Sequence, residues 1–315
     1  MPLGGSESIE ADSIESHTRT SPIGVDMQPR KLLAAYLPTP GGEDALALAI
    51  ALAGPFQASL DVCMVLPPVP DGVGAEVTRT EMLDAQAADM LSAAVTRVPS
   101  DVVAEGHIAF HDNAAEGLVT EAETTESAAI VVGGSGGGIR GRHALGSVVN
   151  DLLHISSKPV VITPLGAAVT ARPVRRITCA IGRRPGAGPL VRAAVDACAR
   201  SGLPLRLVSL VTDDDVAYLR GENQDAARQD VTDHLAEQRE SIAAQLPAGH
   251  DVTSFVLTGD TIDTAIGSLD WKPDDIIFVG SSRLARPHQL FFGATASKVL
   301  QALAIPMVVV PRDPE

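Results

Sequence analysis

Residues 130–164 read IVVGGSGGGIRGRHALGSVVNDLLHISSKPVVITP. The apolar run over 128–132 predicts a buried strand, a glycine-rich loop follows it, and a Gly-Ser pair opens a short amphipathic segment over 148–155. A further apolar run over 159–163 predicts the next strand. Glycines let backbone N–H groups approach an anion without obstruction by Cβ, and a helix start adds unpaired N–H donors. The order of strand, glycine loop and helix start therefore predicts a phosphate-binding loop.

The loop differs in charge from the rest of the chain. Arg140, Arg142 and His143 add positive character to it, whereas the formal net charge of the whole chain is −15. Phosphate contacts along a nucleic acid need clustered Lys and Arg, and base stacking needs aromatic rings, which make up only 3% of the residues. We therefore expect no nucleic-acid partner.

The length of 315 residues predicts about two domains, and a hydrophobic content of 45% can supply their cores. No run of about 18 uncharged apolar residues predicts a membrane span. The N-terminus lacks the basic region and apolar stretch of a secretory signal. Cys63, Cys179 and Cys198 are scattered in apolar settings, which is typical of reduced core residues. We therefore expect a cytoplasmic protein without membrane contact.

Apolar runs alternate with helical patterns after a polar segment, 1–30, that we interpret as a disordered tail. The expected strands are 31–37, 59–66, 102–110, 128–132, 159–163, 176–181, 205–211, 251–257, 275–279 and 306–310. The expected helices are 43–53, 75–98, 114–124, 148–155, 190–200, 226–245, 261–269 and 294–304. This alternation predicts α/β domains with parallel sheets that are covered on both faces.

The pattern restarts after a linker, 166–174, and indicates an internal repeat. Three landmarks recur at one offset of 147 residues: Gly133 and Gly280, Gly146 and Gly293, Pro159 and Pro306. We therefore predict a tandem duplication of doubly wound, Rossmann-like parallel-sheet domains, with domain 1 over 31–165 and domain 2 over 175–312.

The loop spacing Gly133-x2-Gly136-x9-Gly146-Ser147, after a fourth strand and before a helix, resembles the universal stress protein family. The resemblance covers residues 31–311 as two copies and implies an adenine nucleotide alpha hydrolase-like fold. It implies that the loop binds the ribose and phosphates of ATP, with or without a magnesium ion. Carried over by position, the contacts are Gly133, Gly136, Gly146 and Ser147, and we add the neighbouring Gly137.

The sequence departs from the family near the adenosine. Nucleotide-binding members usually have an Asp just after the first strand, where this chain has Leu37. We therefore expect apolar contacts and backbone groups to hold the adenosine, near Val65 at the end of the second strand.

The second copy of the loop departs further. Arg283 stands where domain 1 has Gly136, Ala294 stands where it has Ser147, and Pro287 stiffens the loop. An Arg side chain fills space that a phosphate needs. We therefore predict that domain 2 binds ATP weakly or not at all.

Two other glycine motifs match short stretches of the loop. Residues 133–137 fit G-x-S-x-G, but a hydrolase elbow around Ser135 needs a helix directly after it, and nine residues intervene before Gly146. Residues 136–141 fit G-x-G-x-x-G, but they follow a fourth strand and no acid stands about 20 residues on. A nucleotide-binding loop is the better interpretation of both stretches.

Two polar clusters could hold a cation. His107 and the pair His111-Asp112 share one face of a strand because their spacing is even. Residues 213–215 are three aspartates after the second strand of domain 2. We favour solvated strand-end residues for the first cluster and a solvated turn for the second over metal sites.

The resemblance implies pairing of the edge strands 159–163 and 306–310 within the chain, and such pairing would cover exposed apolar edges. We also expect the whole chain to form a homodimer. The predicted function is regulatory ATP binding in domain 1, with at most slow ATP hydrolysis, because no catalytic base and no metal ligand set is apparent in the sequence. The alternative is a scaffold of two degenerate domains that binds a protein partner and no nucleotide.

Overall fold

The computed structural model describes residues 30–68, 75–134, 140–143, 145–182, 187–212, 224–281 and 293–312. Apart from Arg30, the predicted tail lies outside these residues. The strands are β1 (Arg30–Ala35), β2 (Ala58–Leu66), β3 (Ala104–Phe110), β4 (Ala129–Gly133), β5 (Val160–Thr163), β6 (Arg176–Ala180), β7 (Leu205–Thr212), β8 (Val252–Gly259), β9 (Asp275–Gly280) and β10 (Met307–Val310). The helices are α1 (Pro40–Phe56), α2 (Ala75–Thr96), α3 (Ala114–Thr124), α4 (Ser147–Ile155), α5 (Ala167–Thr170), α6 (Gly188–Ser201), α8 (Gln224–Ala243), α9 (Ile262–Gly267) and α10 (Ala294–Ala302).

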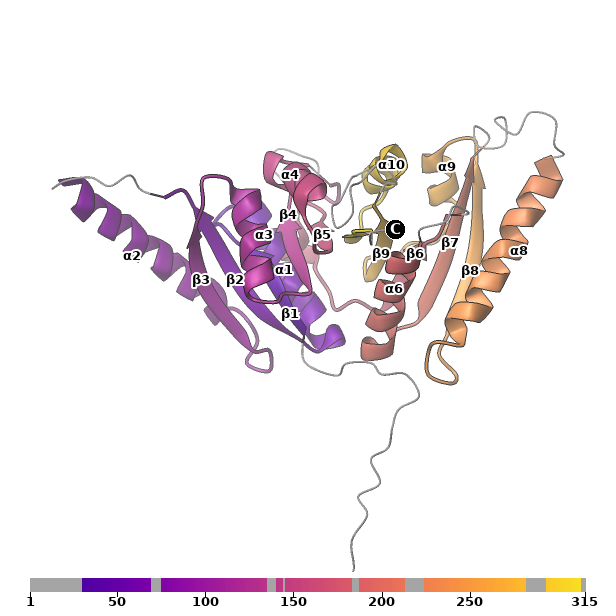
Figure 1. The fold of residues 1–315 in the computed structure, drawn as a ribbon, viewed down its shortest axis with the longest axis horizontal. Coiled ribbons are helices and arrows are strands. Elements are labelled where there is room, and N and C mark those ends of the chain that lie inside the picture. Colours follow the sequence, from indigo (N-terminus) through magenta and orange to yellow (C-terminus); the bar gives the residue numbers. More distant parts are fainter. Residues whose placement is uncertain are drawn as a thin grey trace, which may run out of the picture.

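The ten described strands form one sheet in the order β3-β2-β1-β4-β5-β10-β9-β6-β7-β8. Within each half the paired strands are parallel, and β1 and β6 lie at equivalent places beside β4 and β9. The second half repeats the strand order of the first, as the constant sequence offset predicted (Figure 1). The α/β fold class and the tandem arrangement are confirmed.

The two halves join through β5 and β10, which pair antiparallel, with Val161 opposite Val308. Both strands are four residues long and fully buried: β10 (MVVV) is entirely apolar, and β5 (VVIT) has one threonine beside three apolar residues. In Figure 1 they lie in the middle of the molecule, and α2 and α8 lie at the outer ends. The expected pairing of the two edge strands within the chain is therefore confirmed.

Two apolar clusters lie on the two faces of the sheet, and both cross from one half to the other. One contains residues of α1, α6 and α8, such as Leu48, Leu190 and Leu235. The other contains residues of α3, α4 and α10, such as Leu152 and Val299. Because each cluster contains residues of both halves, the two halves share a common core. Burial of this apolar surface is the dominant stabilising contribution to the fold. Among the described residues, no helix is long and apolar enough to cross a membrane.

One local expectation was wrong, at the start of α1. The helix begins at Pro40 and not at Glu43, because proline suits the first helical position and Thr39 caps the helix by accepting from the Gly42 N–H at 3.2 Å. The linker contains the short helix α5. The buried Asp44 carboxylate accepts hydrogen bonds of 2.7 Å from the Gly166 and Ala168 N–H groups and so fixes this helix to α1.

Candidate functional site

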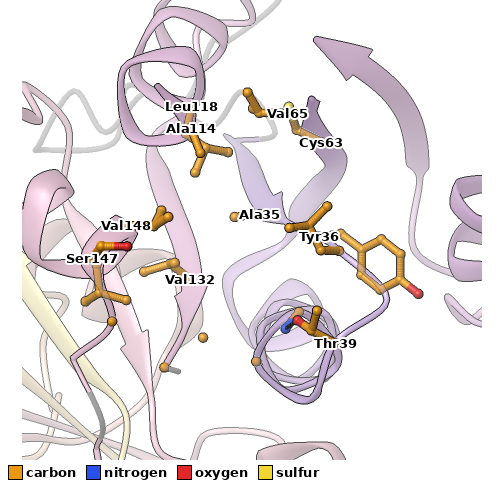
Figure 2. A pocket seen from close by; sticks show the side chains of 17 residues that line it. Ala35, Tyr36, Thr39, Cys63, Val65, Ala114, Leu118, Val132, Ser147 and Val148 are labelled. Atoms are coloured by element: carbon orange, nitrogen blue, oxygen red, sulfur yellow. Dashed lines mark hydrogen bonds between the residues drawn. The ribbon is translucent and has the colours of Figure 1, made fainter. Parts of the chain in front are cut away.

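A cavity of about 230 Å³ lies between β1 and β4, where the strand order of domain 1 reverses direction. In open α/β sheets this switch point, at the carboxyl ends of the strands, is where ligands bind. The described residues that line it are Ala35, Tyr36, Leu37, Thr39, Gly41, Gly42, Cys63, Val65, Ala114, Leu118, Val132, Gly133, Gly134, Gly146, Ser147, Val148 and Val149. Figure 2 shows side chains from β2, α3 and the start of α4 around this space.

The structure brings four of the six predicted site residues together. Gly133, Gly146, Ser147 and Val65 all line the cavity, although β2, β4 and α4 are separate in the sequence. The predicted contacts Gly136 and Gly137 lie outside the described residues, as does Ser135. The placement fits a nucleotide site, and the contacts themselves stay predictions.

The inner side of the cavity is closed by a glycine contact that the sequence analysis did not recognise. A Cβ built on Gly133 would overlap the carbonyl oxygen of Gly41, and a Cβ on Gly41 would overlap the carbonyl oxygen of Gly134. Only glycine permits this approach of the first turn of α1 to the end of β4. The signal in the sequence was the pair Gly41-Gly42 after Pro40, which fell between the expected strand 31–37 and the expected helix 43–53.

The start of α4 faces the cavity with free backbone donors. The N-cap residue Gly146 has an extended backbone (φ −78°, ψ 174°) and, having no side chain, leaves the described first turn without a side-chain cap. The first four N–H groups of a helix lack intrahelical partners, and the positive end of the helix dipole lies there. This end of α4, with the Ser147 hydroxyl beside it, can therefore bind an anion.

The other end of the cavity is apolar. Cys63 and Val65 of β2 and Leu118 of α3 lie there, and none of the described lining residues has a charged side chain. Leu37, at the position of the expected Asp, lines the cavity with 41% of its surface exposed. The ring of Tyr36 points away from Ser147 in Figure 2, and its hydroxyl donates to Glu43 at 2.9 Å. This end suits a flat apolar group such as a purine.

Our interpretation of His107 as a solvated strand-end residue was wrong. Its Nδ1 lies 2.7 Å from Asp61 Oδ1, and its Nε2 lies 3.1 Å from Glu121 Oε2, so both ring nitrogens face carboxylates. The hydrogen bond to Asp61 is the largest cause that raises the pKa of His107 to about 10, and Cys63 adds to it. Within the described part of the chain, no cluster of His, Cys, Asp or Glu has an arrangement that could hold a metal ion. The aspartates 213–215 lie outside that part.

The expectation that His143 adds positive charge to the loop was also wrong. Burial lowers the pKa of His143 to about 4, so its ring is neutral at physiological pH. Arg142 is directed to the other half of the molecule, where Nη1 donates to the carbonyl oxygen of Gln301 at 2.7 Å. The carbon stem of Arg140 lies beside Gly166. These residues therefore hold the end of the loop in place.

The equivalent of the glycine contact in domain 2 lies partly outside the described residues. Gly280 corresponds to Gly133 at the offset of 147 residues, whereas the strand pairing puts the first strands at an offset of 145, since Leu32 pairs with Ala129 and Ile177 pairs with Ile276. Gly41 then corresponds to Gly186, which lies outside the described residues. A Cβ on Gly280 would lie 3.7 Å from the nearest described atom, in Leu190, so no described residue approaches this end of β9 as closely as Gly41 approaches Gly133. The loop residues Arg283 and Pro287 lie outside the described residues.

A second, open cavity of about 400 Å³ lies beside the amino ends of β7 and β8. Its two arginines share one buried carboxylate: Arg176 makes bonds of 2.8 and 2.7 Å to Asp275, and Arg206 makes one of 3.2 Å. The Arg206 guanidinium also lies 4.5 Å from the ring centre of Trp271. The donors of these arginines are thus used within the protein, and the cluster is structural.

The repeated doubly wound fold and the cavity at its switch point agree with the sequence comparisons. Residues 29–164 and 173–311 each match the universal stress protein family, and the chain belongs to this family as a tandem protein, which implies a role in the stress response. The universal stress protein Rv2319c of Mycobacterium tuberculosis (strain ATCC 25618 / H37Rv) is 26% identical over 289 residues, which cover 89% of this chain and 99% of the relative.

Solved structures share the fold at lower identity. A universal stress protein from Archaeoglobus fulgidus DSM 4304 superposes with a TM-score of 0.65 at 16% identity, covering 90% of this chain and 99% of that one. A functionally unknown protein, PA1789 from Pseudomonas aeruginosa PAO1, superposes with a TM-score of 0.56 at 16% identity, covering 91% and 94%. At these identities the likeness concerns the fold alone.

Proposed function

We propose that domain 1 binds ATP in the cavity between β1 and β4, and that nucleotide occupancy regulates the protein in the cytoplasm. The observation that carries the proposal is the contact of Gly41 with Gly133 and Gly134, which closes one side of a cavity whose other side is the uncapped start of α4. Glycines that no larger residue could replace are expected where a backbone must approach a phosphate, because a Cβ would obstruct the approach.

The shape of the cavity suggests how ATP would lie. Its volume of about 230 Å³ is below the range of about 300–1,000 Å³ that drug-sized ligands fill, so it suits the nucleoside part alone. The base would occupy the apolar end beside Cys63, Val65 and Leu118. The phosphates would then extend to Gly146, the Ser147 hydroxyl and the predicted loop contacts Gly136 and Gly137, with or without a magnesium ion.

The chemistry of the cavity supports a regulatory role for the nucleotide. Hydrolysis of ATP is helped by a group that orients water and by positive charge on the transferred phosphoryl group. None of the described lining residues carries a charged side chain, so turnover should be slow or absent. Domain 2 has Arg283 in place of Gly136 and Ala294 in place of Ser147, and we propose that it binds no ATP.

The first test is the nucleotide content and ATP affinity of the full chain. Protein purified without ligand is denatured, and the released nucleotides are identified by mass spectrometry, while calorimetry measures the binding of ATP with magnesium. One ATP per chain supports the proposal, and two per chain contradict the inactivity of domain 2. No nucleotide, no heat of binding and no thermal shift would favour the scaffold function, for which the exposed Leu37 in place of an Asp is the supporting feature.

A matched pair of variants locates the site. Ser147→Asp puts a carboxylate where the phosphates would lie, yet an acid in the first turn favours the helix, so α4 should stay folded. Ala294→Asp makes the same change at the offset of 147 residues in domain 2. We expect the first variant to weaken ATP binding by more than about tenfold, through repulsion of like charges, and the second to leave it unchanged. Equal affinity of both variants would place the site elsewhere.

A further inference from the structure

The segment 140–143, at the end of the glycine loop of domain 1, contacts domain 2. Arg142 Nη1 donates to the carbonyl oxygen of Gln301 at 2.7 Å, and His143 Nε2 donates to the carbonyl oxygen of Ile305 at 2.8 Å. Gln301 lies in the last turn of α10, and Ile305 lies between α10 and β10. Carbonyl groups at the end of a helix lack intrahelical partners and carry the negative end of the dipole, so they attract such donors.

The same segment is held on its other side by domain 1. The Gly141 N–H donates to the carbonyl oxygen of Leu165 at 2.8 Å, and the Leu165 N–H donates to that of Arg142 at 2.9 Å. These bonds join the segment 140–143 to Leu165, which lies just beyond the end of β5, the strand that pairs with β10. The end of the glycine loop therefore lies directly between the two domains.

His143 suits this place as a neutral hydrogen-bond donor. Burial favours the uncharged ring, and donation from Nε2 to Ile305 leaves Nδ1 unprotonated in the interior. The sequence predicts this contact from the loop of domain 1 to domain 2, but it does not predict the equivalent contact from the loop of domain 2 to domain 1. At the offset of 147 residues, Gln289 and Leu290 take the places of Arg142 and His143, and a leucine side chain has no donor.

We propose that Arg142 and His143 are positioning residues, through which domain 2 holds the segment 140–143 in place and so strengthens nucleotide binding in domain 1. The beginning of the loop is fixed by the packing of Gly133 against Gly41, and its end is fixed by the segment 140–143. A loop ordered before binding loses less conformational entropy when the nucleotide binds. This inference rests on ATP binding in domain 1.

The coupling works in both directions. If the contact with domain 2 strengthens nucleotide binding, then bound nucleotide must strengthen the contact by the same factor. The signal would reach β10 and α10, and α10 begins at the loop of domain 2. Occupancy of domain 1 is thereby communicated to domain 2 although domain 2 binds no nucleotide.

The test uses full-length variants that copy the residues of the second loop. Arg142→Gln and His143→Leu each remove one hydrogen bond to domain 2, and we expect each to weaken ATP binding by about five- to tenfold. His143→Gln keeps a nitrogen donor near the position of Nε2 and should restore most of the affinity. Arg142 is exposed, so its variant should fold even if the change at His143 disturbs packing.

His250→Leu is the matched control. His250 Nε2 also lies 2.8 Å from a backbone carbonyl oxygen, that of Leu203, but this bond is within domain 2 and away from the cavity. Its loss should lower stability without changing the affinity for ATP. If His250→Leu lowers the affinity for ATP as much as His143→Leu does, then the effect comes from a general loss of stability and the inference is overturned.

Hydrogen exchange gives a second readout. ATP should slow the exchange of amides in β10 in the wild-type chain, and this protection should be lost in Arg142→Gln. Wild-type affinity in both Arg142→Gln and His143→Leu, or unchanged exchange in β10 on adding ATP, would refute the coupling while leaving the nucleotide site intact. A wild-type chain that binds no ATP would refute the proposed function and this inference together.

Discussion

Replacing His107 by Gln should change how the stability of the protein depends on pH. The imidazole lies between Asp61, whose side chain is 3% exposed, and Glu121, whose side chain is 25% exposed. These carboxylates favour the protonated ring, and the hydrogen bond to Asp61 is the largest cause that raises the pKa of His107 from 6.5 to about 10. The folded protein therefore keeps a proton that the unfolded chain releases near its ordinary pKa.

The sign of the effect follows from this difference. The contribution of His107 to the free energy of unfolding is fully present below about pH 6.5, decreases as the pH rises, and is gone above about pH 10. A shift from 6.5 to about 10 corresponds to at most about 5 kcal/mol. Because about a third of the side chain is exposed and solvent screens its charge, we expect about 2 kcal/mol.

Urea unfolding of the wild-type chain and of His107→Gln at pH 6, 8 and 10 measures this contribution. We expect the difference in free energy of unfolding between the two proteins to be about 2 kcal/mol larger at pH 6 than at pH 10. The double variant Asp61→Asn/His107→Gln also removes the unpaired buried carboxylate, and it should lack this pH dependence while regaining stability over the single variant. A constant difference between wild type and His107→Gln from pH 6 to pH 10 would show that His107 is not held as a cation.

Three further changes test other contacts. Gly41→Ala should abolish ATP binding and lower the melting temperature, since its Cβ would overlap the carbonyl oxygen of Gly134. Gly188→Ala, in the first turn of α6, is the control and should have little effect, since its Cβ would meet only the flexible end of the Arg192 side chain; similar binding of both variants would contradict the assigned contact. Asp275→Asn leaves Arg206 buried without its counter-charge and should cost about 3–5 kcal/mol in urea unfolding; a loss below about 1 kcal/mol would contradict this. Asp44→Ala uncaps α5, costs about 1 kcal/mol and should speed limited proteolysis at this helix, and an unchanged cleavage rate would argue against the anchor.

The architecture could be predicted because its signals are local or repeated. Apolar runs of four to eight residues that alternate with helical patterns identify a parallel sheet wherever they occur. Pro159 and Pro306 precede β5 and β10 at one offset, and this repetition predicted two copies of the same unit. The pairing of those strands followed from the family resemblance and from the need to cover two short apolar edges.

The partners of the site residues could not be predicted, because they lie far apart in the sequence. His107 finds Asp61 across 46 residues and His143 finds Ile305 across 162 residues, and no spacing rule connects such pairs. Gly41 was misread for a related reason. A Pro-Gly-Gly sequence normally indicates a turn. Its packing against β4 becomes visible only when α1 and β4 are placed side by side.

The comparison of the two halves gives a reason why a duplicated protein would keep its second domain even if only the first binds nucleotide, as proposed. The strands and the apolar clusters are retained in both halves, whereas Gln289 and Leu290 take the places of Arg142 and His143 in the second loop. Packing against β10 buries β5, and the end of α10 accepts the bond from Arg142. Loss of domain 2 would therefore expose an apolar strand and release the end of the glycine loop at once. If domain 1 binds nucleotide as proposed, selection for that binding would be sufficient to preserve the fold of the second domain while its own loop diverges.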